Sequence, residues 1–388
     1  MHKILCLNKI SPIGTDRLGD NYEFSTEMQN PEGILVRSAA MHDMELPAEL
    51  LGIARAGAGV NNIPLPKCSE NGIVVFNTPG ANANAVKELV LAALFMTSRK
   101  IIPAIDWAKT LKGNGKEVSK MVEKGKGAFA GPEIMGKKLG VIGLGAIGVL
   151  VANAAHRLGM QVCGYDPFLS VDAAWHLSSS VDKAASLDDI FTKCDYITVH
   201  VPLNDSTRGL IGADALAKMK NGVRILNFSR GELVDTAAIL PMLENGKVAA
   251  YATDFPDDAL IGVENVLAIP HLGASTPESE DNCAVMAVDQ LKDYIENGNI
   301  TNSVNFPAIS MPRSEGHTRI CIAHRNVPNT IGAFTAVCGE ENINIENMLS
   351  KSRGDWAYTI VDASGEIAPD IAEKLQALDP VVRARVIY

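Results

Sequence analysis

The sequence predicts an α/β protein with two parallel-sheet lobes and a smaller C-terminal βαββαβ unit. From residue 1 to about residue 270, short apolar runs alternate with segments in which apolar residues recur at helical spacing. The runs are often β-branched, which is typical of strands that helices cover on both faces. Because alternating strands and helices form parallel sheets with crossover helices, each lobe is expected to be Rossmann-like or flavodoxin-like.

The apolar runs and the helical segments between them place the elements of both lobes along the chain. The strands expected in the first lobe are 4–7, 34–36, 53–56 and 74–77, and the helix 83–97 leaves this lobe. The second lobe begins near Gly136. Its expected strands are 139–142, 162–165, 196–199, 224–227, 248–253 and 266–269, and its expected helices are 148–158, 187–192 and 236–245. A helix at 278–297 then returns the chain to the first lobe.

The last part of the chain follows a linker. Pro307, Pro312 and Gly316 lie in the polar stretch 305–316, which is typical of a connection between domains. Behind it the pattern predicts a ferredoxin-like unit. Its elements are a strand at 318–323, a helix at 329–341, strands at 343–352 and 358–363, a helix at 368–376 and a strand at 381–388. The expected domains are 1–90 with 275–303 (substrate-binding), 91–274 (cofactor-binding), a linker at 304–316 and a regulatory domain at 317–388.

Composition and charge argue against several classes of protein. The chain has 35 Lys and Arg against 45 Asp and Glu, and its net charge of −10 argues against nucleic-acid binding, which needs basic residues. The longest nearly apolar run, 139–152, is shorter than the roughly 18 residues that indicate a membrane span. The 7 cysteines are scattered without C-x-x-C spacing, so we expect neither a metal site nor a disulfide framework. Asn8 and Lys9 come too early for a signal peptide, and a cytoplasmic location is expected.

A glycine-rich motif, G-x-G-x-x-G, begins where the predicted strand 139–142 ends. Gly143 allows a tight turn, Gly145 lets the backbone approach a pyrophosphate, and Gly148 lets the following helix pack closely on the strand. The N-terminus of that helix offers free N–H groups to phosphates. Asp166, at the end of the next strand, can accept hydrogen bonds from ribose hydroxyls and would repel a 2′-phosphate. The motif therefore predicts NAD as the cofactor, and the alternative is a glycine-rich turn without a ligand.

One histidine and one arginine follow predicted strands of the same lobe. His271 and Arg230 are both expected at the carboxyl edge of the sheet, where ligands bind. Oxidation of an alcohol needs a base near neutral pH, and a histidine serves this role. The planar fork of Arg230 can hold a carboxylate. Asp257 or Asp258 is expected to lie beside His271 and to fix its tautomer. The alternatives are a histidine that caps a strand and an ordinary surface ion pair.

These motifs together resemble those of the D-isomer-specific 2-hydroxyacid dehydrogenase family along residues 1–303. The matching segments are 143–148 with Asp166, 227–235 and 270–276. The resemblance implies that Arg230 and His271 are catalytic. It also implies contacts to NAD from Ala146, Ile147, Asp166, Pro202, Thr207, Phe228, Ser229, Arg230 and Asp254. The family usually has a glutamate a few residues after the aspartate that corresponds to Asp254. This chain has none there, so Asp258 or Asp257 is expected to replace it.

The resemblance places the substrate mainly on the first lobe. It implies that the backbone near Ala58 and Gly59 holds the substrate carboxylate, and that Arg37, Arg55 and Asn82 surround the substrate and its phosphate. Two arginines favour a doubly anionic substrate over lactate. The implied reaction is the NAD-dependent oxidation of 3-phospho-D-glycerate to 3-phosphohydroxypyruvate, the first step of L-serine biosynthesis. The alternatives are a glycerate or hydroxypyruvate reductase, another D-2-hydroxyacid dehydrogenase and, in a different class, a binding scaffold that senses NADH.

The C-terminal unit resembles an ACT domain, a module that binds amino acids. His324, Asn326 and Asn344 match the positions that contact serine in this family, so feedback inhibition by L-serine is expected. The alternative is a domain that serves only oligomerisation, and a homodimer or homotetramer is expected. A second basic feature is formed by the lysines at 109, 112, 116, 120, 124 and 126. Either one of these lysines reaches the phosphate site of a partner subunit, or they form a solvated helix face.

Overall fold

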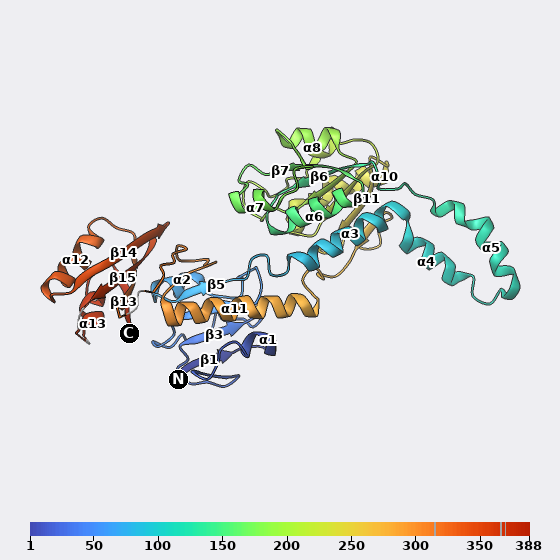
Figure 1. Ribbon diagram of the computed structural model, residues 1–388. Helices are drawn as coiled ribbons and strands as arrows, with labels where there is room; N and C mark the ends of the chain where they lie inside the picture. The colour runs from blue at the N-terminus through green and yellow to red at the C-terminus, as the bar shows by residue number, and fades with distance from the viewer. Residues whose placement is uncertain (314–315, 365–366, 369) are drawn as a thin grey trace. The chain divides into compact units, whose positions relative to one another are not determined.

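The protein forms two compact units in a computed structural model that describes residues 1–313, 316–364, 367–368 and 370–388 (Figure 1). One unit consists of Met1–Ala81 with Pro277–Tyr388, and the other of Asn82–Thr276. Their boundary lies before helix α3 (Ala83–Arg99), not inside it as expected, because the whole helix belongs to the second unit. Residues 317–388, the expected regulatory domain, belong to the first compact unit and have a hydrophobic core of their own.

The first unit holds a five-stranded parallel sheet, which confirms the predicted α/β lobe. The strand order is β2-β1-β3-β4-β5. The strands are β1 (His2–Cys6), β2 (Tyr22–Ser25), β3 (Gly33–Val36), β4 (Gly52–Arg55) and β5 (Val74–Phe76), and the short helices are α1 (Pro12–Thr15) and α2 (Leu65–Glu70). Strand β2 was not predicted. It is an edge strand whose Glu23 and Phe24 are exposed, so no apolar run marks it.

Helix α11 (Pro277–Asn297) packs on this sheet. Glu278 and Glu280 lie in its first turn, where acidic side chains favour the positive end of the helix dipole. Its buried residues recur three or four positions apart and include Ala284, Ala287, Val288, Leu291, Tyr294 and Ile295. Gly33 and Gly52 allow the close approach of the helix, because a Cβ at these positions would lie 2.9 and 3.0 Å from the Leu291 side chain.

The C-terminal part of the first unit has the predicted βαββαβ order (Figure 1). Its antiparallel sheet has the strand order β14-β15-β13-β16. The elements are β13 (Thr318–Arg325), α12 (Thr330–Glu340), β14 (Asn344–Arg353), β15 (Trp356–Ser364), α13 (Ile371–Gln376) and β16 (Val381–Ile387). Residues 314–315 of the predicted linker and residue 369 of the predicted helix lie outside the described residues.

The two faces of this antiparallel sheet have different neighbours. Ile320 and Ile322 point to one face and pack with Phe334 of α12. The alternate residues Cys321 and Ala323 join the core of the first lobe. Because side chains of a strand alternate between faces, the sheet lies between its own helices and the lobe. The C-terminal unit is therefore docked on the lobe through a buried apolar face.

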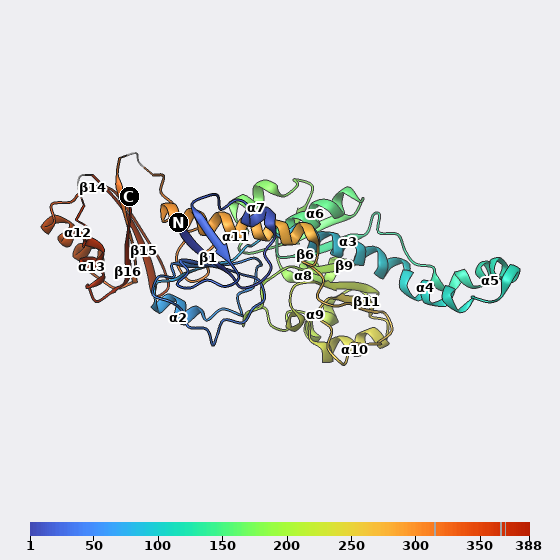
Figure 2. The same ribbon diagram turned by 90° about the horizontal axis from the view of Figure 1, so that it is seen from below.

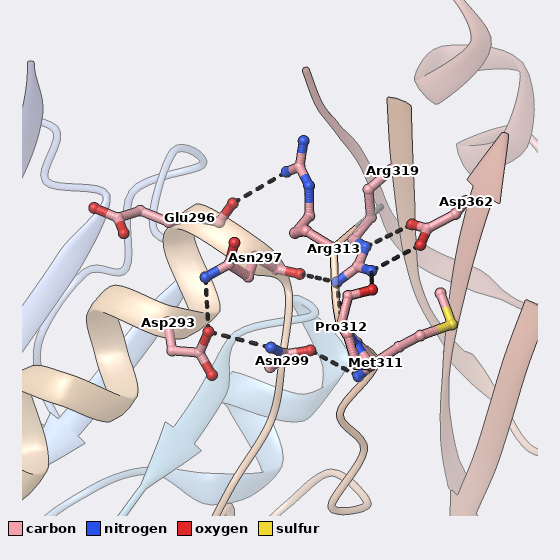
Figure 3. Close-up of polar contacts among 9 residues, drawn as sticks. All are labelled: Asp293, Glu296, Asn297, Asn299, Met311, Pro312, Arg313, Arg319 and Asp362. Carbon is pink, nitrogen blue, oxygen red and sulfur yellow. Dashed lines mark hydrogen bonds and ion pairs between the residues drawn. The ribbon is translucent and has the colours of Figure 1, made fainter. Parts of the chain in front are cut away.

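Arg319 and Arg385 of the C-terminal unit, and Arg313 just before it, bond to the end of α11, and Figure 3 shows Arg313 and Arg319. The last carbonyl groups of a helix have no partner within the helix. Here the carbonyls of Asn297 and Glu296 accept hydrogen bonds from Arg319 (2.8 Å) and Arg313 (3.4 Å). Arg385 donates to the two preceding carbonyls, those of residues 294 and 295. Positive charge at this end also favours the helix dipole, so docking of the C-terminal unit stabilises α11.

The second unit holds a seven-stranded parallel sheet with the order β12-β11-β10-β9-β6-β7-β8, in agreement with the predicted Rossmann-like lobe (Figure 2). Its strands are β6 (Lys138–Ile142), β7 (Gln161–Tyr165), β8 (Asp182–Lys183), β9 (Tyr196–Val199), β10 (Val223–Asn227), β11 (Val248–Thr253) and β12 (Val266–Ala268). Its other helices are α6 (Ala146–Arg157), α7 (Val171–His176), α8 (Leu187–Lys193), α9 (Ala213–Lys218) and α10 (Thr236–Glu244). The strand order reverses at β6, which lies between β7 and β9. In such sheets the crevice at this reversal binds ligands.

An exposed helical segment, residues 101–129, extends from the end of α3 in the second unit (Figure 1). It consists of α4 (Ile101–Thr110), α5 (Val118–Gly125) and two short 3₁₀ helices, Gly115–Glu117 and Lys126–Phe129, and none of these elements has a buried residue. The rings of Trp107 and Phe129 lie 5.2 Å apart and hold the segment together. The lysines noted in the sequence lie along this segment.

Among the helices of the described residues, none is long and apolar enough to cross a membrane.

Candidate active site

The glycine-rich loop follows β6 and leads into α6. Gly143 has a φ of +91°, and a Cβ there would lie 2.5 Å from the carbonyl oxygen of His200. A Cβ at Gly148 would collide with the carbonyl oxygen of Gly143. These two glycines are therefore required by the packing of the protein itself. At Gly145, in contrast, no described atom lies within 4 Å of the position of a Cβ, so the backbone there faces open space that a ligand can enter.

Asp166 fixes this loop from the end of the neighbouring strand β7. Its carboxylate accepts hydrogen bonds from the backbone N–H groups of Leu144 and Phe168, both at 2.8 Å. Each carboxylate oxygen keeps a second lone pair for a ribose hydroxyl. Open space at Gly145, the first turn of α6 with Ala146 and Ile147, and an acid at the end of β7 together fit a dinucleotide.

The other residues expected to contact NAD follow adjacent strands of the same sheet. Pro202 comes after β9, Phe228 and Ser229 after β10, and Asp254 after β11. Thr207 donates a hydrogen bond to the Pro202 carbonyl (2.6 Å) and so closes the turn behind β9. Ser229 donates to the carbonyl at the end of β9 (2.9 Å), which ties two strand ends together. The structure thus brings these predicted residues to one edge, while their contact with NAD stays a prediction.

Asp254 is the buried carboxyl group of this edge. Its side chain is 1% exposed; Oδ2 accepts a hydrogen bond from the Gly273 N–H (3.2 Å), and Oδ1 has no partner among the described residues. Burial raises the pKa of Asp254, whereas the nearby His271 and Arg230 act to lower it. An unpartnered buried oxygen is costly unless a ligand or a proton satisfies it. Asp254 is therefore a further candidate, besides Asp257 and Asp258, for the carboxyl group that acts on His271, the predicted base.

His271 and Arg230 both contact the ring of Phe255. The imidazole and phenyl centroids lie 4.5 Å apart at an interplanar angle of 46°. The guanidinium carbon of Arg230 lies 5.9 Å from the centre of the same ring, and its Nη1 donates to the carbonyl of Ser229 (2.6 Å). Sequence reasoning did not single out Phe255. Its position directly after Asp254 at the end of β11 was the available signal.

The structure shows the surroundings of Asp257 and Asp258, the two aspartates expected beside His271. Asp257 accepts hydrogen bonds from the Thr236 hydroxyl (2.8 Å) and the Leu260 N–H (3.0 Å). Asp258 is exposed. His271 acts to lower the pKa of Asp254, against the effect of burial. The assignment of Asp258 or Asp257 as the catalytic carboxylate therefore stays a prediction without geometric support.

In the first unit, the predicted substrate residues gather at the carboxyl ends of β3 and β4. Arg37 follows β3, and Arg55 ends β4 and donates from Nε to the Arg37 carbonyl (3.0 Å). A Cβ at Gly57 would lie 2.7 Å from Arg55 Nη1, so the guanidinium lies across the loop that continues to Ala58 and Gly59. Two cationic side chains and a glycine-containing loop therefore share one edge of this sheet, which suits an anionic ligand.

Two further contacts shape this edge. Asn8 accepts hydrogen bonds on Oδ1 from three consecutive N–H groups, residues 37–39, at 2.9 to 3.1 Å. The Arg37 guanidinium pairs with Glu280 in the first turn of α11 (2.7 Å), and both side chains are about half exposed. Asn82, the remaining predicted substrate residue, is the N-cap of α3 and begins the second unit.

The predicted effector residues lie in the C-terminal unit, where His324 is buried. Its Nδ1 is 2.9 Å from the Arg325 carbonyl, and its Nε2 is 2.9 Å from the Thr359 hydroxyl. Burial lowers the pKa of His324, which favours the neutral ring with Nδ1–H donating to the carbonyl. Asn326 and Asn344 are exposed and donate to the Gly354 carbonyl (3.0 Å) and the Glu346 carboxylate (2.7 Å). Both ring nitrogens of His324 are already engaged, so its contact with an amino acid stays a prediction.

Neither a metal cluster nor a disulfide competes with this interpretation. In residues 1–313, 316–364, 367–368 and 370–388, no group of three or more His, Cys, Asp or Glu side chains is placed to hold a metal ion. All seven cysteines are buried and unpaired.

Comparison with known proteins finds a family model that matches most of the second unit. The family model "D-isomer specific 2-hydroxyacid dehydrogenase, NAD binding domain" matches residues 91–273. The D-3-phosphoglycerate dehydrogenase of Haemophilus influenzae is 32% identical over 356 residues, which are 89% of this chain and 83% of the relative. That of Escherichia coli K12 is 31% identical over 372 residues, 92% of this chain and 86% of the relative. The human D-3-phosphoglycerate dehydrogenase is 37% identical over 306 residues. Those residues are 76% of this chain and 55% of the human protein, so the match spans about half of that relative's length.

Solved structures show the same fold. An NAD⁺-bound 3-phosphoglycerate dehydrogenase from Entamoeba histolytica has a TM-score of 0.60 and 24% identity, and the match covers 78% of this chain and 98% of that protein. A D-2-hydroxyisocaproate dehydrogenase has a TM-score of 0.65 and 22% identity, with 79% and 100% coverage.

Proposed function

The chain belongs to the D-isomer-specific 2-hydroxyacid dehydrogenase family of NAD-dependent oxidoreductases, and from this premise we propose that its substrate is 3-phospho-D-glycerate. The product is 3-phosphohydroxypyruvate, and the reaction is the first step of L-serine biosynthesis. The proposal rests on the position of Arg37 and Arg55, which lie together at the ends of adjacent strands, beside the 57–59 loop. Two arginine side chains at one edge of the sheet suit a substrate with both a phosphate and a carboxylate.

The residues of the second unit supply the proton transfer and the orientation of the substrate. His271 accepts the proton of the C2 hydroxyl, so that the O–H bond breaks as an N–H bond forms on the imidazole. Arg230 binds the substrate carboxylate and stabilises the negative charge that develops on the C2 oxygen. Gly145, the first turn of α6 and Asp166 are suited to hold the pyrophosphate and ribose of NAD, which when bound supplies the hydride acceptor.

Consumption of NADH with 3-phosphohydroxypyruvate tests this proposal directly. Glyoxylate, hydroxypyruvate and pyruvate are compared under the same conditions. A kcat/KM for the phosphorylated acid well above those of the others supports the assignment. A preference for hydroxypyruvate or glyoxylate would overturn it in favour of a reductase of the same family. NADH binding without turnover of any 2-oxo acid would instead favour a scaffold that senses the cofactor.

We also propose that L-serine inhibits the enzyme through the C-terminal unit. The support is its βαββαβ order and the exposed Asn326 and Asn344. Asn329 has a positive φ of 65°, so the turn before α12 forms although glycine is absent there. The assay is repeated with millimolar L-serine. Suppression of turnover that Asn326→Ala weakens supports regulation, and an unchanged rate would leave this unit with a role in assembly.

We propose that the enzyme is a cytoplasmic homodimer or homotetramer that associates through the 101–129 segment. Around it, Phe95, Ile101, Ile102, Ile105 and Met121 are exposed, and the first four are between 39% and 49% accessible. Apolar side chains gathered in this way are typical of an interface. An Ile105→Lys variant is expected to shift the mass measured by light scattering to that of a smaller species. The same assembly would bring a lysine of 109–126 to the phosphate site of a partner subunit. An unchanged mass would place the interface elsewhere.

A further inference from the structure

A single aromatic ring contacts both side chains to which the proposed reaction assigns chemical roles. The Phe255 ring lies 4.5 Å from the His271 imidazole centroid and 5.9 Å from the guanidinium carbon of Arg230. Both distances fall within the range of stacking and cation–π interactions. Phe255 is therefore in a position to fix how the base and the arginine lie relative to each other.

The backbone holds Phe255 in this place. Its N–H donates to the Thr253 hydroxyl at the end of β11 (3.1 Å). On the other side, a Cβ at Gly231 would lie 3.3 Å from the Phe255 Cβ, so the glycine leaves just enough room for the aromatic residue. The next residue of the chain, Pro256, has a fixed φ, which limits the freedom of the turn. A ring that is held from several sides can position its neighbours.

The carboxyl groups near His271 leave a role for this ring. In the oxidation direction His271 becomes positively charged when it takes the hydroxyl proton. Asp257 accepts hydrogen bonds from Thr236 and Leu260, whereas the buried Asp254 accepts one from Gly273 on Oδ2 and has no partner on Oδ1 among the described residues. The negative face of an aromatic ring attracts a cation, so Phe255 stabilises the charged imidazole beside the contribution of Asp254.

We propose that Phe255 is a positioning residue. Its ring orients both His271 and Arg230, and it favours the protonated form of His271. This inference rests on the proposed function, in which His271 is the base. It deepens that function by assigning to an aromatic residue part of the role for which the sequence supplies no glutamate.

Replacement of the ring, with and without its aromatic character, tests the inference. Phe255→Leu keeps an apolar side chain but removes the ring, and Phe255→Tyr keeps the ring. The expected result is a fall in kcat of about five- to tenfold for Leu, in line with a partly desolvated cation–π contact. The tyrosine variant is expected to stay within about twofold of the wild type. The KM for NAD should change in neither variant, because no predicted NAD contact is removed.

The pH profile separates positioning from loss of packing. The charged groups of the second unit that face His271, Asp254 and Arg230, are the same in every variant. Loss of the ring is expected to move the pH midpoint of activity to lower values in both reaction directions, because the protonated imidazole loses a favourable neighbour. Phe191→Leu is the matched control. Phe191 is a residue of α8 that is buried in the core, so this variant is expected to lower the melting temperature without moving the profile.

A titration that does not depend on turnover keeps the inference and the proposed function distinguishable. The NMR signal of His271 is assigned by its absence in His271→Gln, and its titration midpoint is compared in the wild type and the two Phe255 variants. A lower midpoint in the leucine variant alone supports the inference, whatever substrate the enzyme prefers. Equal midpoints, or a tyrosine variant that behaves like leucine, would overturn it. Wild-type turnover that survives in His271→Gln would refute the proposed base itself.

Discussion

Replacing Arg319 by methionine is expected to lower the free energy of unfolding of the first unit by about 4 kcal/mol. The guanidinium is 0% exposed and forms a two-bond ion pair with Asp362, at 2.7 and 2.8 Å. It also donates to the carbonyls of Asn297, Met311 and Pro312, each at 2.8 Å (Figure 3). The substitution leaves a buried carboxylate and three carbonyl oxygens without this donor. Breaking one side of a buried pair destabilises a protein by about 3–5 kcal/mol, from which our value is taken.

The chain contains a matched control for this argument. Arg17 forms an ion pair of the same kind with Asp289, at 2.6 and 2.9 Å, but both side chains are about half exposed. Arg17→Met is therefore expected to lose far less stability than Arg319→Met, because solvent screens an exposed ion pair. In a double variant, Arg319→Met with Asp362→Leu, most of the stability should return, because an apolar pair can replace a buried ion pair.

The assay combines thermal unfolding with hydrogen exchange. Arg319→Met is expected to melt roughly 10 °C below the wild type, with faster exchange in β13, β15 and the end of α11. Exchange in the seven-stranded sheet of the second unit should not change. A loss as small as that of Arg17→Met, or a double variant as unstable as the single one, would refute the reasoning from burial.

Four further substitutions test the loops, the buried histidine and the substrate edge. Gly145→Ala is expected to weaken NADH binding about tenfold with an unchanged melting temperature, because the added Cβ meets only open space, as a fluorescence titration can check. Gly148→Ala, which collides with the backbone, is expected to lose about 2–3 kcal/mol of unfolding free energy in urea. Burial lowers the pKa of His200 to about 4, below its value of about 6.5 in the unfolded chain, so the unfolded state binds more protons between these values. Stability should therefore fall by up to about 3 kcal/mol as the pH drops from 6.5 to 4, and His200→Asn should reduce this slope in urea unfolding at pH 7 and pH 4.5. Glu280→Gln frees the arginine that it pairs with and should lower the KM for 3-phosphohydroxypyruvate by about two- to fivefold, whereas Glu278→Gln, with the same loss of charge, should not.

The elements of the fold could be predicted closely where their signal is local. Strands β9 and β11 have the bounds expected from their apolar runs, and α3 begins at the expected residue. The strands that were not predicted have a physical property in common. Strands β2 and β8 are short edge strands with exposed side chains, so no run of buried residues distinguishes them from loops.

The residues of the candidate site also differ in how well the sequence predicted their positions. Sequence spacing alone placed Gly143, Asp166 and His271 at strand ends, because the carboxyl ends of parallel strands meet at one edge of a sheet. It pointed to Asp257 or Asp258 as the neighbour of His271, on proximity along the chain. In the structure His271 acts on the pKa of Asp254, and Asp257 accepts a hydrogen bond from Thr236, while the assignment of Asp258 or Asp257 as the catalytic carboxylate stays a prediction.

The sequence by itself determined the alternation of strands and helices, the glycine-rich loop and its acid, and the βαββαβ order of the C-terminal unit. Each of these depends on neighbouring residues and on the periodicity of burial along the chain. Only the tertiary structure decided that this unit docks on the first lobe and that Phe255 joins His271 to Arg230. Arg319, which bonds to the end of α11, is held by Asp362, a residue 43 positions away on the neighbouring strand of its own sheet. No local pattern specifies such a contact, because it depends on which faces of folded elements bury each other.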